Sequence, residues 1–191
     1  MAPVWDPKNS PPQTVVVRGE REETKASARE STANLQAYEE HMRLAINVAR
    51  EGVAKGQTPF GACIVKDGQV LASAHNTVWE TKDVTAHAEV NAIREACRVL
   101  GSIDLSGCVL YTTCEPCPMC FSAAHWARIT RIVYGATVGD AQKAGFNKLT
   151  VSAFEMKRAG GSKVEIIGGI LRQECVGVIK EWLNRPDHLT Y

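Results

Sequence analysis

Two short motifs constrain the fold of this chain more than any other feature of its sequence. The first is H-A-E at residues 87–89, and the second is P-C-P-M-C at residues 116–120. One histidine and two cysteines can hold a zinc ion and leave its fourth coordination position open for water, as catalytic zinc sites do. If His87, Cys117 and Cys120 share one ion, the fold must bring both motifs to a single point.

The spacing of the two cysteines indicates that they lie at the start of a helix. Cys117 and Cys120 are three residues apart, and Pro118 suits the first position of a helix. Residues three apart share one side of a helix, so both sulfur atoms would face the same point. The positive end of the helix dipole also favours thiolate over thiol. His87 and Glu89 are two apart, and helical periodicity alone does not place them on one face.

The paired motifs resemble those of zinc-dependent nucleobase deaminases of the cytidine deaminase-like superfamily, in which H-x-E and P-C-x-x-C occur together. The resemblance extends over roughly residues 38–150 and is strongest to bacterial guanine deaminases. Three stretches carry it: P-F-G-A at residues 59–62, T-A-H-A-E-V at residues 85–90 and C-E-P-C-P-M-C-F at residues 114–121. The resemblance implies one Zn²⁺ per chain, held by His87, Cys117 and Cys120.

The resemblance also implies roles for further residues. Glu89 would take a proton from the water, pass it to a ring nitrogen of the substrate and later protonate the leaving ammonia. In these deaminases this glutamate is not a metal ligand. Five residues are expected to contact the substrate: Phe60, Asn76, Ala88, Trp126 and Tyr191. From the residues alone, Phe60 and Trp126 could equally pack in the core, and Asn76 could be a turn residue.

Cys114 leaves a second interpretation of the metal site open. Together with Cys117 and Cys120 it forms C-x-x-C-x-x-C. With His87 these cysteines could complete a structural Cys₃His site, or they could hold an iron–sulfur cluster. Two features favour the open catalytic site, because prolines bracket only Cys117 and because Glu89 would have no role in a closed site.

Several heterocycles are candidate substrates. Guanine ranks first because the motifs and residues 144–146 fit the guanine deaminase branch, although Asn147 stands where those enzymes usually carry aspartate. A cytosine-type free base, or a related aminopurine or triazine, ranks second. The wobble adenosine of tRNA ranks third: residues 168–175 resemble tRNA adenosine deaminases, but a net charge of +1 provides no basic field for nucleic acid. A zinc-stabilised binding module is the alternative that is not an enzyme.

The number of cysteines and the N-terminal sequence indicate the cellular compartment of the protein. The chain has seven cysteines, an odd number, and no apolar N-terminal signal region. These features favour a reducing cytoplasm over a disulfide scaffold. No apolar run approaches the ~20 residues that cross a membrane, so no membrane association is expected. The resemblance further implies a homodimer, paired through the metal-bearing helices, that acts on a small-molecule nucleobase.

Apolar periodicity predicts an alternation of helices and strands. Helices are expected over residues 35–55, 87–100, 118–128 and 170–183, and strands over residues 108–113, 131–134 and 164–167. Residues 58–73 are expected to form a hairpin around Asp67-Gly68, a strong turn signal. This order predicts an α/β fold, and the resemblance implies a cytidine deaminase-like three-layer α/β/α sandwich with a mixed five-stranded sheet. Residues 1–34 are expected to form a flexible N-terminal arm, and residues 35–191 the catalytic domain.

Overall fold

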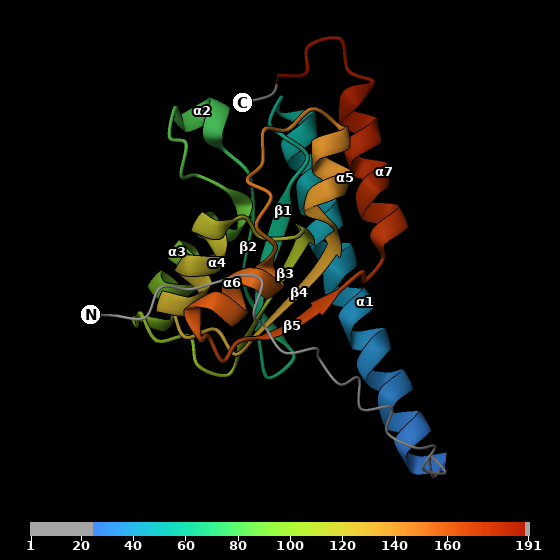
Figure 1. Cartoon of the computed structure of the whole chain (residues 1–191), viewed down its shortest axis with the longest axis vertical. Coiled ribbons are helices and arrows are strands. Elements are labelled where there is room, and N and C mark those ends of the chain that lie inside the picture. Colours follow the sequence, from blue (N-terminus) through green and yellow to red (C-terminus); the bar gives the residue numbers. More distant parts are fainter. Residues whose placement is uncertain (1–24, 190–191) are drawn as a thin grey trace, which may run out of the picture.

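A computed structural model describes the backbone of residues 25–189 and the side chains of residues 34–189. Helices and strands alternate along this range (Figure 1). In chain order they are α1 (Lys25–Ala54), β1 (Gly61–Lys66), β2 (Gln69–His75), α2 (Val78–Thr81), α3 (Ala88–Leu100), β3 (Cys108–Cys114), α4 (Pro118–Trp126), β4 (Arg131–Ala136), α5 (Val138–Lys143), α6 (Ala153–Gly160), β5 (Glu165–Gly168) and α7 (Arg172–Leu183). No helix between residues 25 and 189 combines the length and the apolar character that a membrane span requires.

The strands form one mixed sheet in the order β2-β1-β3-β4-β5. β1 pairs antiparallel with both β2 and β3, whereas β3, β4 and β5 run parallel. The hairpin of β1 and β2 turns at Asp67 and Gly68, whose φ angles of 50° and 76° lie in the left-handed region that this turn requires. The structure confirms the predicted hairpin and the mixed five-stranded sheet.

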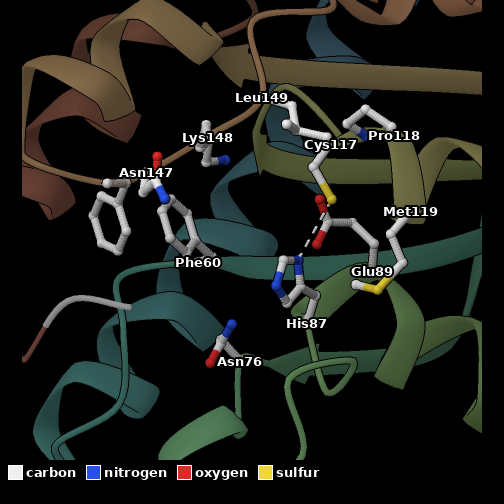
Figure 2. Close-up of a pocket in the computed structure, with 11 residues that line it drawn as sticks. Phe60, Asn76, His87, Glu89, Cys117, Pro118, Met119, Asn147, Lys148 and Leu149 are labelled. Carbon is white, nitrogen blue, oxygen red and sulfur yellow. Dashed lines mark hydrogen bonds between the residues drawn. The ribbon is translucent and has the colours of Figure 1, made fainter.

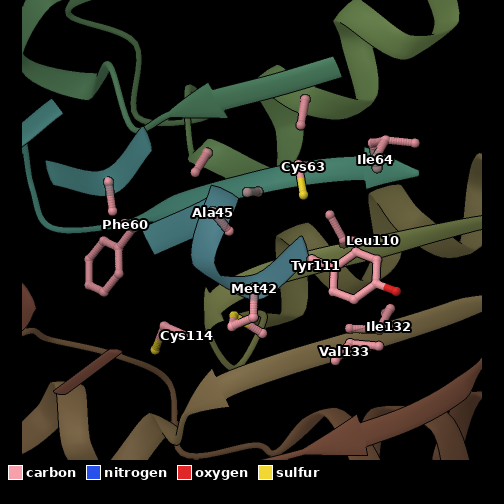
Figure 3. Close-up of a cluster of buried hydrophobic side chains, with 14 of the residues drawn as sticks. Met42, Ala45, Phe60, Cys63, Ile64, Leu110, Tyr111, Cys114, Ile132 and Val133 are labelled. Carbon is pink, nitrogen blue, oxygen red and sulfur yellow. The ribbon is translucent and has the colours of Figure 1, made fainter. Parts of the chain in front are cut away.

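Helices cover both faces of the sheet and complete the three-layer sandwich (Figure 1). α1 and α7 pack on one face, while α3 packs on the other face with α4 beside it. Figure 3 shows Met42 and Ala45 of α1 among the buried side chains that cover β1 and β3, including Cys63 and Tyr111. Because α3 and α4 share one face, the two helices expected to carry the metal ligands are neighbours, as the resemblance implied.

One glycine allows α1 to lie close against the sheet. A Cβ atom on Gly61, the first residue of β1, would lie 2.2 Å from the carbonyl oxygen of Ala45 and 2.6 Å from the backbone nitrogen of Ala49. Both distances are far below van der Waals contact, so a larger residue would fit only if α1 moved away. Gly61 therefore holds the start of β1, and with it the preceding residue Phe60, against α1.

The structure corrects one helix boundary and adds short helices. α1 begins at Lys25 rather than at the predicted Leu35, and residues 1–24 of the predicted arm lie outside the described residues. The sequence did not predict α2, α5 or α6, because each is too short to show an apolar period. Capping boxes begin two of them, at Thr137 for α5 and at Ser152 for α6.

Asp140 ties the start of α5 to α7. Its carboxylate accepts hydrogen bonds of 2.9 Å from the backbone N–H and the hydroxyl of Thr137. It also accepts hydrogen bonds of 2.9 and 2.7 Å from Nε and Nη2 of Arg172. The Arg172 guanidinium, together with the Thr137 bonds, lowers the pKa of Asp140 from its usual 3.8 to about 2. Such a carboxylate stabilises the fold above its unfolded-state pKa and loses that contribution as pH falls through its folded-state pKa.

Asp140→Asn is expected to lower the free energy of unfolding by about 1–2 kcal/mol at neutral pH, because a helix cap and an ion pair are lost. The difference from wild type should shrink as pH falls from 3.8 to about 2, where the wild-type carboxylate takes up its proton. Urea unfolding at a series of pH values measures both effects. Asp187→Asn, which removes an exposed pair with Arg185, is the matched control and should change stability little. A difference for Asp140→Asn that does not vary with pH would contradict this account.

Candidate active site

The candidate site lies at the edge of the sheet where β3 and β4 end. β3 ends at Cys114, directly before the second motif. Because β1 runs antiparallel to β3, the beginning of β1 lies at the same edge and brings Phe60 there. Because β2 runs antiparallel to β1, its end brings Asn76, whose backbone N–H donates to the Phe60 carbonyl oxygen at 3.0 Å. The edge at which parallel strands end is the usual position of ligands in α/β folds.

Three side chains from two helix starts converge at this edge. His87 precedes α3 and Cys117 precedes α4, each as the N-cap, and Cys120 lies in the first turn of α4. The two sulfur atoms are 3.6 Å apart, and Nδ1 of His87 lies 3.7 Å from Cys117 Sγ and 3.4 Å from Cys120 Sγ. Tetrahedral zinc bonds of about 2.3 Å to sulfur and about 2.0 Å to nitrogen imply ligand separations of about 3.5–3.8 Å. The three side chains therefore match the dimensions of a zinc site.

The protonation of the two cysteines also suits a cation. Hydrogen bonding to Cys120, and less strongly to His87, lowers the pKa of the Cys117 thiol to about 3. The hydrogen bond to Cys117 and burial raise the pKa of Cys120 well above its usual 9.0. Cysteine ligands lose their protons when a divalent cation binds, and the low pKa of Cys117 favours this loss. Zn²⁺ fits this site, with His87, Cys117 and Cys120 as its ligands.

Cys114 lies outside this cluster. Its Sγ donates to the carbonyl oxygen of Thr137 at 3.7 Å and accepts a hydrogen bond from Nζ of Lys148 at 3.2 Å. Among the described His, Cys, Asp and Glu residues, three place their ligand atoms within 4.8 Å of one another: His87, Cys117 and Cys120. Cys114 is not part of this group. The structure therefore gives no support to the alternative Cys₃His or iron–sulfur site, which needs Cys114 as a ligand.

Glu89 stands beside the ligand cluster without belonging to it. Its side chain, 6% exposed in the first turn of α3, lines the same cavity as His87 and Cys117 (Figure 2). Burial raises the pKa of the Glu89 carboxyl group above its usual range, although His87 opposes the rise. A carboxyl group with a raised pKa accepts and releases protons nearer to neutral pH. This environment supports the predicted proton-transfer role.

A cavity of about 250 Å³ opens beside the cluster. Drug-sized ligands occupy roughly 300–1,000 Å³, so this cavity suits a single heterocyclic base. Two residues expected to contact the substrate, Phe60 and Asn76, line it. The Phe60 ring packs edge to face with Phe146, with 4.8 Å between ring centres. Asn76 is fully buried, its Oδ1 accepts a hydrogen bond from the N–H of Val78 at 3.0 Å, and Figure 2 shows its amide nitrogen on the cavity side.

Two other predicted substrate contacts, Ala88 and Trp126, do not line this cavity, and the third lies outside the described residues. Ala88 is fully buried, and its side chain lies outside the cavity lining. The structure corrects both interpretations of Trp126: within one chain it neither lines the cavity nor packs in the core, because the end of α4 leaves its side chain 82% exposed. Tyr191 lies outside the described residues. The nearby Leu189 is tied to α2, since its carbonyl oxygen accepts a hydrogen bond of 3.2 Å from Nε1 of Trp79.

Lys148 is a cavity residue that the sequence did not identify. It follows α5 in the segment that also brings Phe146 and Leu149 to the cavity. Its backbone is held in place, because its N–H donates to the Phe146 carbonyl oxygen at 2.9 Å and its carbonyl accepts from the Gln142 side chain at 3.3 Å. A lysine in a polar segment carries no local signal that would have placed it in a cavity.

Glu115, the second residue of C-E-P-C, holds this segment at both ends. The buried carboxylate accepts a hydrogen bond of 3.1 Å from the N–H of Val138 and one of 2.9 Å from the N–H of Ala153. These are the first residues of α5 and α6, where helix dipoles favour negative charge. Because Lys148 lies between the two helices, Glu115 anchors the loop that brings Lys148 to the cavity.

Comparison with known proteins adds independent information. The family model described as the cytidine and deoxycytidylate deaminase zinc-binding region matches residues 35–136. Guanine deaminase of Bacillus subtilis (strain 168) is 51% identical over 58% of this chain and 71% of that protein. The tRNA-specific adenosine deaminase of the same organism is 36% identical over 75% of this chain and 87% of that protein. A solved structure of guanine deaminase from Nitrosomonas europaea superposes with a TM-score of 0.71 and 27% identity, covering 77% of this chain and 85% of that one.

The matched region and the geometry of the site agree with each other. Residues 35–136 include the three candidate zinc ligands and Glu89, as well as Phe60 and Asn76 of the cavity wall. The same side chains form a cluster with the dimensions of a zinc site beside a cavity for one base. This chain therefore belongs to the cytidine and deoxycytidylate deaminase zinc-binding family and is a zinc-dependent hydrolytic nucleobase deaminase.

Proposed function

We propose that this deaminase converts guanine to xanthine and ammonia. The observation that carries the proposal is the cavity of about 250 Å³, which Phe60, Asn76, Glu89 and two of the zinc ligands line together. A site of this size accepts one base and keeps it beside the group that moves protons. The 51% identity with the guanine deaminase of Bacillus subtilis supports guanine among the possible bases.

The proposed reaction replaces the exocyclic amine at C2 of guanine with oxygen. When bound, zinc supplies a water molecule whose pKa is about 7 instead of about 15.7. Glu89 would accept one proton from the attacking water and deliver it to N3 of the ring as the bond from oxygen to C2 forms. It would then take the second proton from the new hydroxyl on C2 and give it to the amine as the bond from C2 to nitrogen breaks. The oxygen of water stays on C2 and ammonia leaves, so one water is consumed for each ammonia released.

Phe60 and Asn76 are proposed to orient the base. The Phe60 ring offers an apolar surface against which a flat heterocycle can pack. Asn76 is held by the N–H of Val78, and this contact directs its amide nitrogen to the cavity, where it can donate to an acceptor of the ring. Both side chains are buried, so little side-chain entropy is lost when the base binds.

Ammonia release from a panel of bases tests the proposal. Zinc-loaded wild-type protein would be incubated with guanine, guanosine, adenine, cytosine and a triazine, in parallel with Glu89→Ala. Guanine is expected to react fastest, and Glu89→Ala to release no ammonia above background. Equal signals from the two proteins would leave only the zinc-stabilised binding module. Faster turnover of cytosine or of the triazine would replace guanine with that base.

A second candidate is deamination of the wobble adenosine in tRNA. It is favoured by the tRNA-specific adenosine deaminase of Bacillus subtilis, because the match covers 87% of that protein. Against it, the net charge is only +1, and both Arg172 and Arg185 are paired with carboxylates rather than directed to a phosphate backbone. Inosine formation in added tRNA transcripts is the measurement. Inosine without any turnover of guanine would reverse the ranking.

We further propose that two copies of the chain pair through the layer that contains α3, α4 and α6. Large apolar side chains on or beside these helices are exposed, among them Trp126 at 82%, Ile103 at 83% and Phe154 at 52%. Exposed apolar groups gathered on one layer are typical of protein interfaces, where tryptophan is especially frequent. A second copy on this layer would remove them from water.

Sedimentation of the zinc-loaded protein is expected to show twice the chain mass of 20.8 kDa. Trp126→Ser should shift the equilibrium toward the monomer without loss of zinc, because the side chain is exposed and is not part of the ligand cluster. Val70→Ser, which removes a 45% exposed apolar side chain on β2, is the control and should leave the dimer intact. A wild-type monomer at micromolar concentration would refute the proposed pairing.

We also propose that the protein is cytoplasmic, as expected from the sequence. All seven cysteines are free, and Cys117 and Cys120 must stay reduced to bind zinc. A reducing compartment meets this requirement. Recovery of the protein outside the cytosolic fraction of its source cells would contradict this location.

A further inference from the structure

Lys148 brings a cationic side chain to the cavity wall. Its Nζ lies 3.2 Å from Cys114 Sγ and 4.6 Å from the centre of the Phe60 ring. Figure 2 shows the amino group pointing toward the side of the cavity that holds Glu89 and Cys117. The hydrolysis proposed above assigns it no role. Lys148 is half-buried, and withdrawing a charged amino group from water even in part is costly unless it meets strong partners, so its position calls for a physical reason.

Within the protein, the direct contacts of this amino group are a sulfur atom and an aromatic ring. Among the described side chains, Lys148 forms no ion pair with a carboxylate, and its Nζ hydrogen bond goes to a thiol sulfur, which is a weak acceptor. The Phe60 ring adds a cation–π contact. Burial lowers the pKa of Lys148, but its hydrogen bond to the Cys114 sulfur and the nearby Glu89 raise it overall.

An ammonium group has three N–H donors, and the Cys114 sulfur takes one of them. A strong acceptor on a bound ligand would satisfy a second donor where the ligand itself displaces water from the cavity. The cavity therefore combines the Lys148 donor on its wall with Glu89, His87 and Cys117 at the position of the reaction. This arrangement suits a heterocycle that carries an acceptor oxygen away from the leaving amine.

We propose that Lys148 is a specificity-determining residue that donates a hydrogen bond to an exocyclic oxygen of the substrate. The preferred substrates are then amino-heterocycles that also carry an oxo group, as guanine does at C6 and cytosine at C2. Adenine has no such oxygen, and once bound it would cover the ammonium without offering that acceptor, which a polar site rejects strongly. This inference rests on the proposed function as a deaminase of bases and narrows the class of base that it accepts.

Pairs of bases that differ in this oxygen isolate the effect. Guanine is compared with 2-aminopurine, which lacks O6, and cytosine with 4-aminopyrimidine, which lacks O2. The ratio of kcat/KM within each pair is measured for zinc-loaded wild type and for Lys148→Met, whose side chain has similar length but no charge or donor. The preference for the oxo base is expected to fall by about 10- to 100-fold in the variant, the range for a charged hydrogen bond. Differences in intrinsic reactivity cancel, because the same pair is measured in both proteins.

Three further variants separate specificity from folding. Lys143→Met replaces an exposed lysine on α5 and should leave the ratio unchanged. Lys148→Arg keeps a charged donor and should retain most of the preference. Lys148→Gln keeps a neutral donor and should give an intermediate ratio, which also provides a measurement if Lys148→Met does not fold. Zinc content and thermal midpoint are recorded for every protein.

The possible outcomes distinguish this inference from the proposed function. A ratio that changes by less than about twofold in a folded neutral variant would overturn the role of Lys148 and leave the deaminase reaction intact. Wild-type protein that turns over adenine or adenosine faster than any oxo base would also overturn the role of Lys148 and leave the deaminase reaction intact. The absence of turnover of every base by zinc-loaded wild type would instead refute the proposed function, and this inference with it.

Discussion

Glu89→Gln is expected to lower kcat for guanine deamination by about 10²- to 10⁴-fold, the contribution of a well-positioned general acid–base group. Glutamine keeps the size of the Glu89 side chain but cannot carry a proton between water, ring and leaving amine. Zinc content should remain at one ion per chain, because Glu89 is not in the ligand cluster. KM should change little if the lost interaction belongs to the transition state alone. Steady-state kinetics and metal analysis of one preparation measure all three quantities.

Glu95→Gln on the same helix is the matched control for this experiment. Glu95 is exposed on α3, pairs with Arg98 at 2.6 Å and does not line the cavity. Its replacement removes a carboxylate of the same type and should leave kcat unchanged. Near wild-type kcat in a zinc-loaded Glu89→Gln protein would show that another group transfers the proton.

Cys120→Ser is expected to abolish zinc binding and, with it, measurable activity. A serine hydroxyl is a much poorer zinc ligand than a thiolate, and only His87 and Cys117 would remain. Loss of the ion also removes the free energy that zinc binding adds to the folded state, so the thermal midpoint should fall. Mass-spectrometric metal content, ammonia release and thermal unfolding of the purified variant test the three expectations.

Cys114→Ser provides the comparison that makes this result decisive. Cys114 is buried in the same motif, but its sulfur contacts Thr137 and Lys148 rather than the ligand cluster. The variant should therefore keep one zinc per chain. Equal loss of zinc in Cys114→Ser and Cys120→Ser would point to a closed site with four protein ligands, which has no open position for water.

The metal site could be predicted from the sequence because its information is local. The spacing of Cys117 and Cys120, with Pro118 between them, is enough to indicate one side of a helix start, and the structure has Cys117 as the N-cap of α4. The turn at Asp67-Gly68 was predictable for the same reason, since two residues with left-handed φ angles specify it. Local patterns of this kind do not depend on what the rest of the chain packs against.

The surroundings of the metal site were harder to predict. Trp126 is large and apolar near the end of a helix, a pattern equally consistent with core, cavity or surface, and its exposure depends on which elements pack beside α4. Lys148 lies in a polar segment without periodicity. It reaches the cavity because Glu115 binds the first residues of both α5 and α6, a contact between residues far apart in the chain.

By itself, the sequence determined the class of chemistry of this protein, and it predicted three zinc ligands and the carboxylate beside them. The pair Cys117 and Cys120 can be read from a short spacing, whereas His87 and Glu89 were predicted from the resemblance of both motifs to those of nucleobase deaminases. Only the tertiary structure decided what else surrounds the substrate, namely that Phe60, Asn76 and Lys148 share one cavity while Trp126 does not. The physical reason is that strand direction and loop packing assemble a cavity wall from distant segments, so its composition depends on long-range contacts rather than on local pattern.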